Sequence, residues 1–596
     1  MATFAKFNDQ LKDITEGWSK WQIAACVGAP IALGLAGLWY YNRSKSSNKA
    51  SLDLSGGDLT TKGDHAESKT KSKNAQKVKP PQAQGRQELA QLAKTKGNKC
   101  FKEGKYEEAI ACYTEAIKTC PPDIKADMST FYQNRAAAFE NLKKFPEVVE
   151  DCDSALELNP RYSKALARRS KAREQLQKYR ESLEDITKAC LIEGFQNQTY
   201  LQAADRVLKT LGKSKAATEY KVKKPTNPST FYVENYLAGF VNDPVALGFP
   251  VVDQDNLKEM GITVKENIGE NGAVLLEKPG AFERAKACLS SKEYDQVVSL
   301  CDEELSDESS SSYVSQALLL RGTMRLLQGM GDAAFADLDR LGGMEGVSPS
   351  LQASALIRAG SLQMQKDASE NALSYFEKAE SVDPKNSDVF HHFGQQLLQL
   401  EKLDEAIKKF DTSIELSPDF PTSYVQKYYA VHRKAIVTED LSLLTKAKTG
   451  FEETIQKFPQ CSDALILYAQ ALSDQGNFAD AEKFFKKAQE VQPRNANNVV
   501  HRGLMTLQWK GDVDQTLKLL EEALRIDPTC QYAFEIRGTI EVQRGNLSEA
   551  VKSFKQAIAL SNSESEMAHL FSLMEAAEVQ VKVARDLNIQ LPSNMM

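Results

Sequence analysis

Five polar side chains are distributed over three successive segments between residues 88 and 211. Each lies on the first helix of an expected helical hairpin, at a position that faces the concave side when such hairpins stack. Lys and Arg form charge-assisted hydrogen bonds to carboxylates that are roughly twice as strong as neutral ones, and amide groups add further donors. The set predicts a solvent-facing groove for carboxylates, and consists of Lys94, Asn98, Asn134, Lys164 and Arg168.

The elements that must position these side chains come from an internal repeat of about 34 residues. Small residues recur where two antiparallel helices must approach closely, as at Gly97, Gly394 and Gly538. Aromatic residues recur where neighbouring hairpins leave space, at Tyr113, Phe376, Phe410, Phe485 and Phe554. A proline marks the end of seven units, at Pro121, Pro160, Pro384, Pro418, Pro459, Pro493 and Pro528.

This pattern resembles the tetratricopeptide repeat, whose helix-turn-helix units stack into a right-handed superhelix. The resemblance implies an all-α protein of about eleven units in two superhelical domains behind an N-terminal transmembrane helix. Three units cover residues 88–211, and seven or eight cover roughly residues 281–585. Some of these are degenerate, such as the unit around Gly322, Ala334 and Leu338. The helical pattern of residues 565–587 is expected to cap the second array.

One segment near the N-terminus is apolar enough to cross a membrane. Residues 23–41 carry no charged side chain over nineteen residues, which as a helix of 1.5 Å rise per residue nearly spans a hydrocarbon core of about 30 Å. A cleaved signal peptide is the alternative, but such a peptide begins with a positively charged region, whereas the acidic side chains among residues 1–22 balance the lysines there. The cations at Arg43, Lys45 and Lys49 then place the bulk of the chain in the cytosol.

The expected organisation has six parts. Residues 42–86 form a flexible polar linker, because they contain too few large apolar side chains to offset the entropy of ordering. Between the arrays the repeat register is lost. The parts are a short N-terminal segment (1–22), the anchor (23–41), the linker (42–86), a three-repeat domain (87–211), a connecting region (212–280) and a C-terminal array (281–596).

Composition and motifs argue against several classes of function. The chain is 42% hydrophobic and 26% charged with a formal net charge of −6, so we expect no nucleic-acid binding. We find no phosphate-binding loop, no GxSxG nucleophile elbow and no HExxH motif, and no stretch outside the repeats is long enough for a catalytic domain. The cysteines have no metal-ligand spacing. We therefore expect a binding protein that is not an enzyme and holds neither cofactor nor metal.

The groove set resembles the two-carboxylate clamp of co-chaperone tetratricopeptide domains. That resemblance implies that Lys94, Asn98, Asn134, Lys164 and Arg168 bind the C-terminal Glu-Glu-Val-Asp of heat-shock chaperones of the seventy- and ninety-kilodalton classes. A solvated helix face is the plain alternative for any single Lys or Arg, and five matches in register disfavour it. Substitutions at such solvent-facing positions are expected to leave stability nearly unchanged.

Anchor, linker, clamp and second array together resemble the family of seventy-kilodalton import receptors of the mitochondrial outer-membrane translocase. Supporting stretches in the C-terminal half include "GLMTLQWKGD" and "GTIEVQRGNLSEAVKSF". The resemblance implies a single-pass outer-membrane protein with its N-terminus in the intermembrane space. It also implies that hydrophobic preproteins, notably metabolite carriers, pass from chaperones through this receptor to other translocase subunits. A chaperone-docking receptor on the endoplasmic reticulum and an assembly scaffold without clients remain open alternatives.

A second groove is expected in the C-terminal array, where corresponding positions carry mixed side chains without a cluster of cations. Such a lining suits an extended or helical peptide with apolar anchors. Packing within the array is an equally good account of any single member. The candidate preprotein-binding residues are His391, Gln395, Ile466, Gln470, His501, Met505, Glu535 and Thr539.

Overall fold

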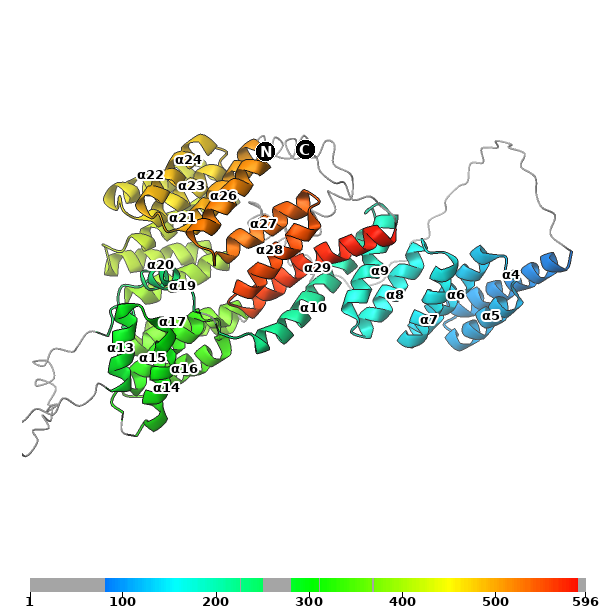
Figure 1. Cartoon of the computed structure of the whole chain (residues 1–596), viewed down its shortest axis with the longest axis horizontal. Coiled ribbons are helices and arrows are strands. Elements are labelled where there is room, and N and C mark those ends of the chain that lie inside the picture. The colour runs from blue at the N-terminus through cyan, green and yellow to red at the C-terminus, as the bar shows by residue number, and fades with distance from the viewer. Residues whose placement is uncertain (1–80, 226, 250–279, 310, 367–368, 588–596) are drawn as a thin grey trace, which may run out of the picture. The chain divides into compact units, whose positions relative to one another are not determined.

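The computed structural model describes residues 81–225, 227–249, 280–309, 311–366 and 369–587. Among these residues every regular element is a helix (Figure 1). The elements are α4 (Pro81–Lys102), α5 (Tyr106–Thr119), α6 (Lys125–Asn141), α7 (Phe145–Leu158), α8 (Ser163–Gln175), α9 (Tyr179–Ile192), α10 (Gln198–Val222), α11 (Thr230–Leu237), α13 (Ala281–Ser291), η1 (Tyr294–Gln296), α14 (Val297–Glu304), η2 (Leu305–Asp307), α15 (Val314–Leu327), α16 (Gly331–Gly343), α17 (Pro349–Gln365), α18 (Ser369–Val382), α19 (Ser387–Gln399), α20 (Leu403–Leu416), α21 (Pro421–Thr438), α22 (Leu441–Lys457), α23 (Ser462–Asp474), α24 (Phe478–Val491), α25 (Ala496–Lys510), α26 (Val513–Ile526), α27 (Gln531–Gln543), α28 (Leu547–Leu560) and α29 (Glu564–Asp586).

Helical hairpins succeed one another along the chain, which confirms the predicted all-α tetratricopeptide fold. Three hairpins run from α4 to α9, and further hairpins run from α13 to α28, with α10 and α11 between the two series. Figure 1 shows α4 to α9 following one another side by side in chain order.

The small and aromatic positions of the repeat pack against each other as predicted. A Cβ added to Gly97 would lie 2.7 Å from the ring of Tyr113, and one added to Gly394 would lie 2.7 Å from the ring of Phe410. In the degenerate unit, Leu338 takes the place of the aromatic residue, 2.8 Å from a Cβ added to Gly322. The second helix therefore approaches the first so closely that no side chain fits between them.

The prolines of the repeat mark helix ends, also as predicted. The residue before each proline is disfavoured in helical conformation because the proline ring collides with it. Accordingly, α5 ends at a cap formed by Cys120 with φ −62° and ψ 131°, and α7 ends at Asn159 with φ −141° and ψ 87°. The same non-helical cap precedes Pro418, at Ser417.

The chain divides into two compact units. Of the described residues, unit 1 comprises 81–215, 538–552 and 571–587, so it joins the first three hairpins to parts of α27 and α28 and to the second half of α29. Val579 and Val583 of α29 pack into one apolar cluster with residues of α9 and α10, including Leu183 and Leu208. The C-terminal helix thereby covers the apolar face at the end of the three-hairpin array.

Ion pairs reinforce this contact within unit 1. The carboxylate of Glu575 is fully buried and pairs with Arg180 at 3.0 Å and with Lys215. Lys582 of α29 donates to Glu184 of α9 at 2.6 Å. A buried carboxylate is tolerated when it is paired and hydrogen-bonded, and the Oε1 of Glu575 accepts hydrogen bonds from both cations.

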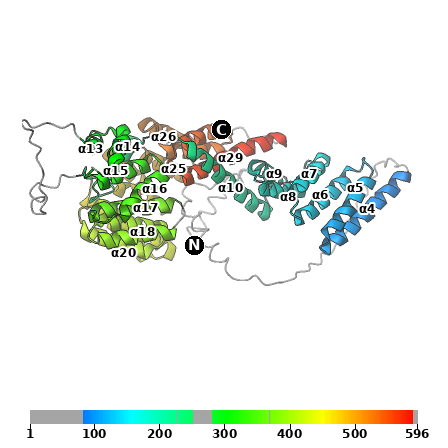
Figure 2. The ribbon, with the colours of Figure 1, turned by 90° about the horizontal axis from the view of Figure 1, so that it is seen from below.

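Unit 2 comprises residues 216–537 and 553–570. Its hairpins from α13 to α18 lie beside one another in both views (Figures 1 and 2). Residues 212–222, which the sequence analysis assigned to the connecting region, are the last turns of α10, where Ala216 is fully buried. Residues 230–249 follow as α11 and an irregular segment. Val233 of α11 and Phe240 and Val245 of the irregular segment belong to the apolar clusters of unit 2.

Within the described ranges, none of the helices combines the length and the apolar character needed to cross a membrane. The predicted anchor at residues 23–41 and the predicted linker up to residue 80 lie outside the described residues.

Candidate functional site

The two asparagines of the predicted clamp lie next to each other in unit 1. The Nδ2 of Asn134 on α6 donates to the Oδ1 of Asn98 on α4 at 3.3 Å. The hydroxyl of Tyr113 on α5 donates to the same oxygen at 2.8 Å. Since both bonds occupy the oxygen of Asn98, its amide NH₂ group remains available as a donor to a ligand.

Tyr113 is therefore a positioning residue as well as a packing residue. Its side chain is buried at 2% exposure against Gly97, and burial raises its pKa to about 12, so the hydroxyl keeps its proton. The repeat pattern predicts the aromatic position of Tyr113 but not its hydrogen bond to Asn98. The available signal was the phenol itself, since the corresponding positions in later repeats carry Phe376, Phe410 and Phe485, which have no hydroxyl.

The two lysines of the clamp carry free positive charge. Lys164 is exposed at the start of α8, and Lys94 is half-buried on α4, where its Nζ donates to the Oε1 of Gln91 at 3.3 Å. Neither lysine forms a salt bridge with any residue that the structure describes. Their charges are not neutralised within the protein, so both can interact with an anionic ligand.

Arg168 differs from the prediction because it is only 21% exposed and already paired. Its Nε donates to Glu140 at 2.8 Å, and its Nη1 donates to the carbonyl of Gln133 at 3.2 Å. Lys171 also contacts Glu140 at 2.7 Å. Burial raises the pKa of Glu140, but the hydrogen bonds from Lys171 and Arg168 outweigh it and hold that pKa below the usual value.

Other arginines of the same array form ion pairs between its helices. Arg135 binds Asp151 through two bonds of 2.8 and 2.6 Å, and Arg169 binds Asp185 in the same two-pronged way at 2.8 and 2.5 Å. The carboxylates of Asp151 and Asp185 are almost completely buried. These pairs join the first helix of a hairpin to the second, so Arg135 and Arg169 are structural cations, unlike the unpaired Lys94 and Lys164.

The second predicted set divides into two halves. Four of its members are core side chains: His391 at 0% exposure, Ile466 at 8%, Met505 at 3% and Thr539 at 5%. His391 lies between α19 and the neighbouring hairpin, where its Nδ1 is 2.9 Å from the hydroxyl of Ser423 and its ring meets Phe420 at 5.0 Å. These four side chains are part of the packed interior of the array.

The other four members are partly exposed: Gln395, Gln470, His501 and Glu535. The Oε1 of Gln395 lies 3.0 Å from the Nδ1 of His392, the next residue after the buried His391. His501 packs on the ring of Tyr532 at 5.6 Å, and burial lowers its pKa to about 4, so it is neutral at physiological pH. The array thus presents neutral and amide side chains, with Glu535 as the one charged member of this partly exposed set.

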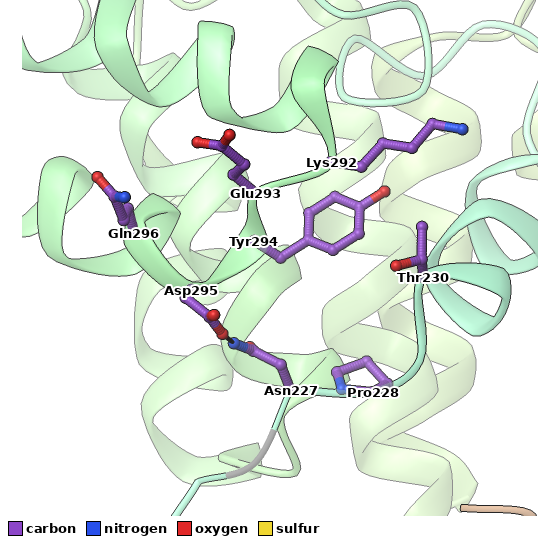
Figure 3. A pocket seen from close by; sticks show the side chains of 8 residues that line it. All are labelled: Asn227, Pro228, Thr230, Lys292, Glu293, Tyr294, Asp295 and Gln296. Carbon is purple, nitrogen blue, oxygen red and sulfur yellow. Dashed lines mark hydrogen bonds between the residues drawn. The ribbon is translucent and has the colours of Figure 1, made fainter. Parts of the chain in front are cut away.

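A small hollow of about 360 Å³ lies elsewhere in unit 2 and contains no member of either set. Its lining includes Asn227, Thr230, Lys292 and Tyr294 (Figure 3). Asn227 donates to Asp295 there, and Lys292 pairs with Glu234 of α11.

Family models and known relatives agree with this architecture. Models described as tetratricopeptide repeat match residues 95–123, 353–386 and 444–499. The chain is 42% identical to the human mitochondrial import receptor subunit TOM70 over 590 residues, which cover 97% of this chain and 94% of the relative. It is 24% identical to the corresponding subunit of Saccharomyces cerevisiae over 539 residues, covering 85% of this chain and 82% of the relative.

The solved structures include a crystal structure of the yeast Tom70. It matches 84% of this chain and 98% of its own length at 22% identity, with a TM-score of 0.45.

Proposed function

This chain belongs to the TOM70 family of mitochondrial import receptor subunits, and from that premise we propose that it docks chaperones and receives preproteins at two separate sites. The first site is the clamp of Lys94, Asn98, Asn134, Lys164 and Arg168, which binds the C-terminal Glu-Glu-Val-Asp of heat-shock chaperones of the seventy- and ninety-kilodalton classes. The second lies in the C-terminal array and accepts hydrophobic preproteins of the carrier type for transfer to other translocase subunits.

The observation that carries the clamp proposal is the separation of free from neutralised groups. Lys94 and Lys164 have no acidic partner among the described residues, whereas Arg135 and Arg169 are fully engaged within the fold. Tyr113 and Asn134 turn the amide of Asn98 so that its NH₂ group is free. Free cations and a pre-oriented donor in one unit suit a ligand with two carboxylates.

The preprotein site is proposed for the C-terminal array because three of its four partly exposed candidates are neutral. Gln395, Gln470 and His501 offer hydrogen bonds without strong charge, beside the buried apolar residues Ile466 and Met505. Hydrophobic clients need such a surface, because isolated charges resist desolvation.

We further propose a single-pass anchor at residues 23–41 in the mitochondrial outer membrane, with the N-terminus in the intermembrane space and the repeats in the cytosol. Protease added to intact mitochondria then removes everything after about residue 44. Protection of the repeats from protease would contradict this orientation.

The test of the two-site division uses the full chain. Deletion of residues 281–596 is unsuitable, because it would remove Val579, Val583 and Glu575, which pack within unit 1. Point variants avoid this problem: Lys94→Ala with Lys164→Ala for the clamp, and Gln470→Lys with His501→Lys for the array.

Each variant is measured in two assays, calorimetric titration with a peptide ending in Glu-Glu-Val-Asp and crosslinking to a newly made carrier precursor without chaperone. The clamp variant is expected to lose peptide affinity and keep the crosslink, and the array variant is expected to do the opposite. Loss of both activities in either well-folded variant would contradict two separate sites.

A further inference from the structure

An irregular segment after α11 is held by unit 2 in the manner of a bound peptide. Residues 240–243, Phe-Val-Asn-Asp, contact α17 and α19, the first helices of two successive hairpins. Residues on these first helices line the concave face of a tetratricopeptide array, where peptides bind. The contacts combine one aromatic anchor, two backbone amides and one carboxylate.

The carboxylate is bound by a buried arginine of α17. The Nη1 of Arg358 lies 2.6 Å from one oxygen of Asp243, and its Nη2 lies 3.0 Å from the other. The two side chains are 1% and 0% exposed. A two-pronged arginine is the geometry that best recognises a single carboxylate.

The backbone of the segment is bound by α19. The carboxylate of Asp388 accepts the N–H groups of Val241 at 2.8 Å and of Asn242 at 2.7 Å. The side chain of Asn242 donates to the hydroxyl of Ser387 at 2.8 Å. These bonds go to backbone amides, so they do not depend on the side chains of the segment.

The aromatic anchor stacks between groups of both helices. The ring of Phe240 lies 4.4 Å from the guanidinium of Arg358 and 4.2 Å from the ring of His392. It is 8% exposed and belongs to a cluster with Leu356 and Phe393. An aromatic side chain three residues before a carboxylate is thus the pattern that this surface selects.

Residues 240–243 do not use all of the hydrogen-bonding capacity of the site. The Nε of Arg358 is buried and has no partner among the described residues. A buried donor without a partner is costly, and a buried ion pair contributes little net stability because desolvation offsets the attraction. The contacts of residues 240–243 are therefore specific, but the ion pair between Asp243 and Arg358 adds little to the free energy that keeps this segment in place.

We propose that the surface formed by Ser387, Asp388 and His392 of α19 with Arg358 of α17 is a peptide-binding site for segments with an aromatic residue three positions before an acidic one. Residues 240–243 are its resident ligand, and a client segment of the same pattern replaces them. This inference rests on the proposed preprotein role of the array and names the client chemistry that it selects.

The test uses the full chain and a fluorescent peptide with the sequence of residues 238–245, Ala-Gly-Phe-Val-Asn-Asp-Pro-Val. The double variant Phe240→Ala with Asp243→Asn weakens the resident ligand and leaves α17 and α19 unchanged. We expect it to bind the peptide at least tenfold more tightly than the native chain does. A peptide with Asn in place of its Asp and a peptide with Ala in place of its Phe are both expected to lose this gain.

Two controls keep the result decisive. Asn227→Ala alters unit 2 in the hollow of Figure 3 and is expected to bind the peptide as the native chain does. If the double variant fails to fold, Phe240→Ala alone keeps the pairing of Asp243 with Arg358, and it replaces the double variant in the titration.

A competition measurement separates this inference from the proposed function. Excess peptide is expected to reduce crosslinking of a carrier precursor to the native chain, and the Asn-containing peptide is expected to leave it unchanged. A folded variant with no gain in peptide affinity, together with crosslinking unaffected by either peptide, would overturn the peptide site while leaving the receptor role intact. Absence of any precursor crosslink would instead count against the receptor role.

Discussion

Replacement of Arg168 by Ala gives the sharpest measure of the clamp. Two of the three guanidinium nitrogens are engaged in the free protein, with Glu140 at 2.8 Å and the carbonyl of Gln133 at 3.2 Å. The donors left for a ligand carboxylate make one or at most two charge-assisted bonds. Their loss is expected to weaken tail binding by roughly 1.5–3 kcal/mol, which is about ten- to a hundredfold in affinity.

The pairing with Glu140 adds a prediction of opposite sign. Glu140 neutralises Arg168 and repels an incoming carboxylate, so Glu140→Gln is expected to tighten tail binding by roughly 0.5 kcal/mol, about twofold. Arg168→Lys is expected to recover only part of the lost affinity, since an ammonium group lacks the planar fork. Arg206→Ala is the matched control, because it removes an arginine of unit 1 that pairs with Glu174 outside the clamp.

Stability sets the limits of this experiment. Arg168 and Glu140 are both about one-fifth exposed, so the substitution costs more than a fully solvent-facing one would. Glu140 keeps Lys171 as a partner at 2.7 Å, and the free energy of unfolding is therefore expected to fall by no more than about 1 kcal/mol. Denaturant melts of the full chain check this value.

Calorimetric titration of the full chain with a peptide ending in Glu-Glu-Val-Asp, and with its C-terminally amidated form, completes the assay. Amidation removes one carboxylate and is expected to cost as much affinity as the loss of one clamp cation. Equal affinities for native and Arg168→Ala chains, and for free and amidated peptides, would refute the clamp and leave its cations as a solvated helix face.

Three further predictions follow from other contacts. Tyr113→Phe removes the hydroxyl that orients Asn98 and is expected to weaken tail binding by about 0.5–1.5 kcal/mol in the same titration, whereas unchanged affinity would show that Asn98 needs no such support. Glu575→Ala removes the buried carboxylate that joins α29 to α9 and α10, and is expected to lower the stability of unit 1 by about 1–3 kcal/mol, seen as faster amide exchange in α9; native exchange rates would contradict this. Burial lowers the pKa of His392 and of His501 to about 4, so below pH 6.5 the unfolded chain binds more protons than the folded chain does. Each histidine is therefore expected to lower the free energy of unfolding by roughly 2–3 kcal/mol as the pH falls from 6.5 to 4. His392→Gln is expected to flatten this dependence in denaturant melts, and an equally steep curve would refute it.

Local contacts explain why so much of the fold was predictable. Gly97 and Tyr113 are sixteen residues apart in one hairpin, and the requirement that they fit together recurs with the period of the repeat. A helix end before proline is a property of two neighbouring residues. Such rules act within a single unit, so the sequence of that unit is sufficient to apply them.

The clamp was predictable in part for the same reason. Asn98 and Asn134 both lie on the first helices of neighbouring hairpins, and stacking brings their side chains to 3.3 Å. The partner of Arg168 was not predictable, because Glu140 lies at the far end of α6 and meets the guanidinium only through the rotamers of both long side chains. Likewise His391 and His392 are adjacent in sequence, and only the packing around α19 decided that His391 meets Ser423 and that His392 stacks on Phe240.

The sequence by itself determined the repeat, the all-α architecture and the family, because each depends on short-range patterns that recur many times along the chain. The tertiary structure alone decided which distant segments complete each unit. Residues 571–586 pack with α9 and α10 across more than 350 positions, and Asp243 meets Arg358 across 115. Contacts of this separation leave no period in the sequence, since each is made once and depends on where the whole superhelix carries the chain.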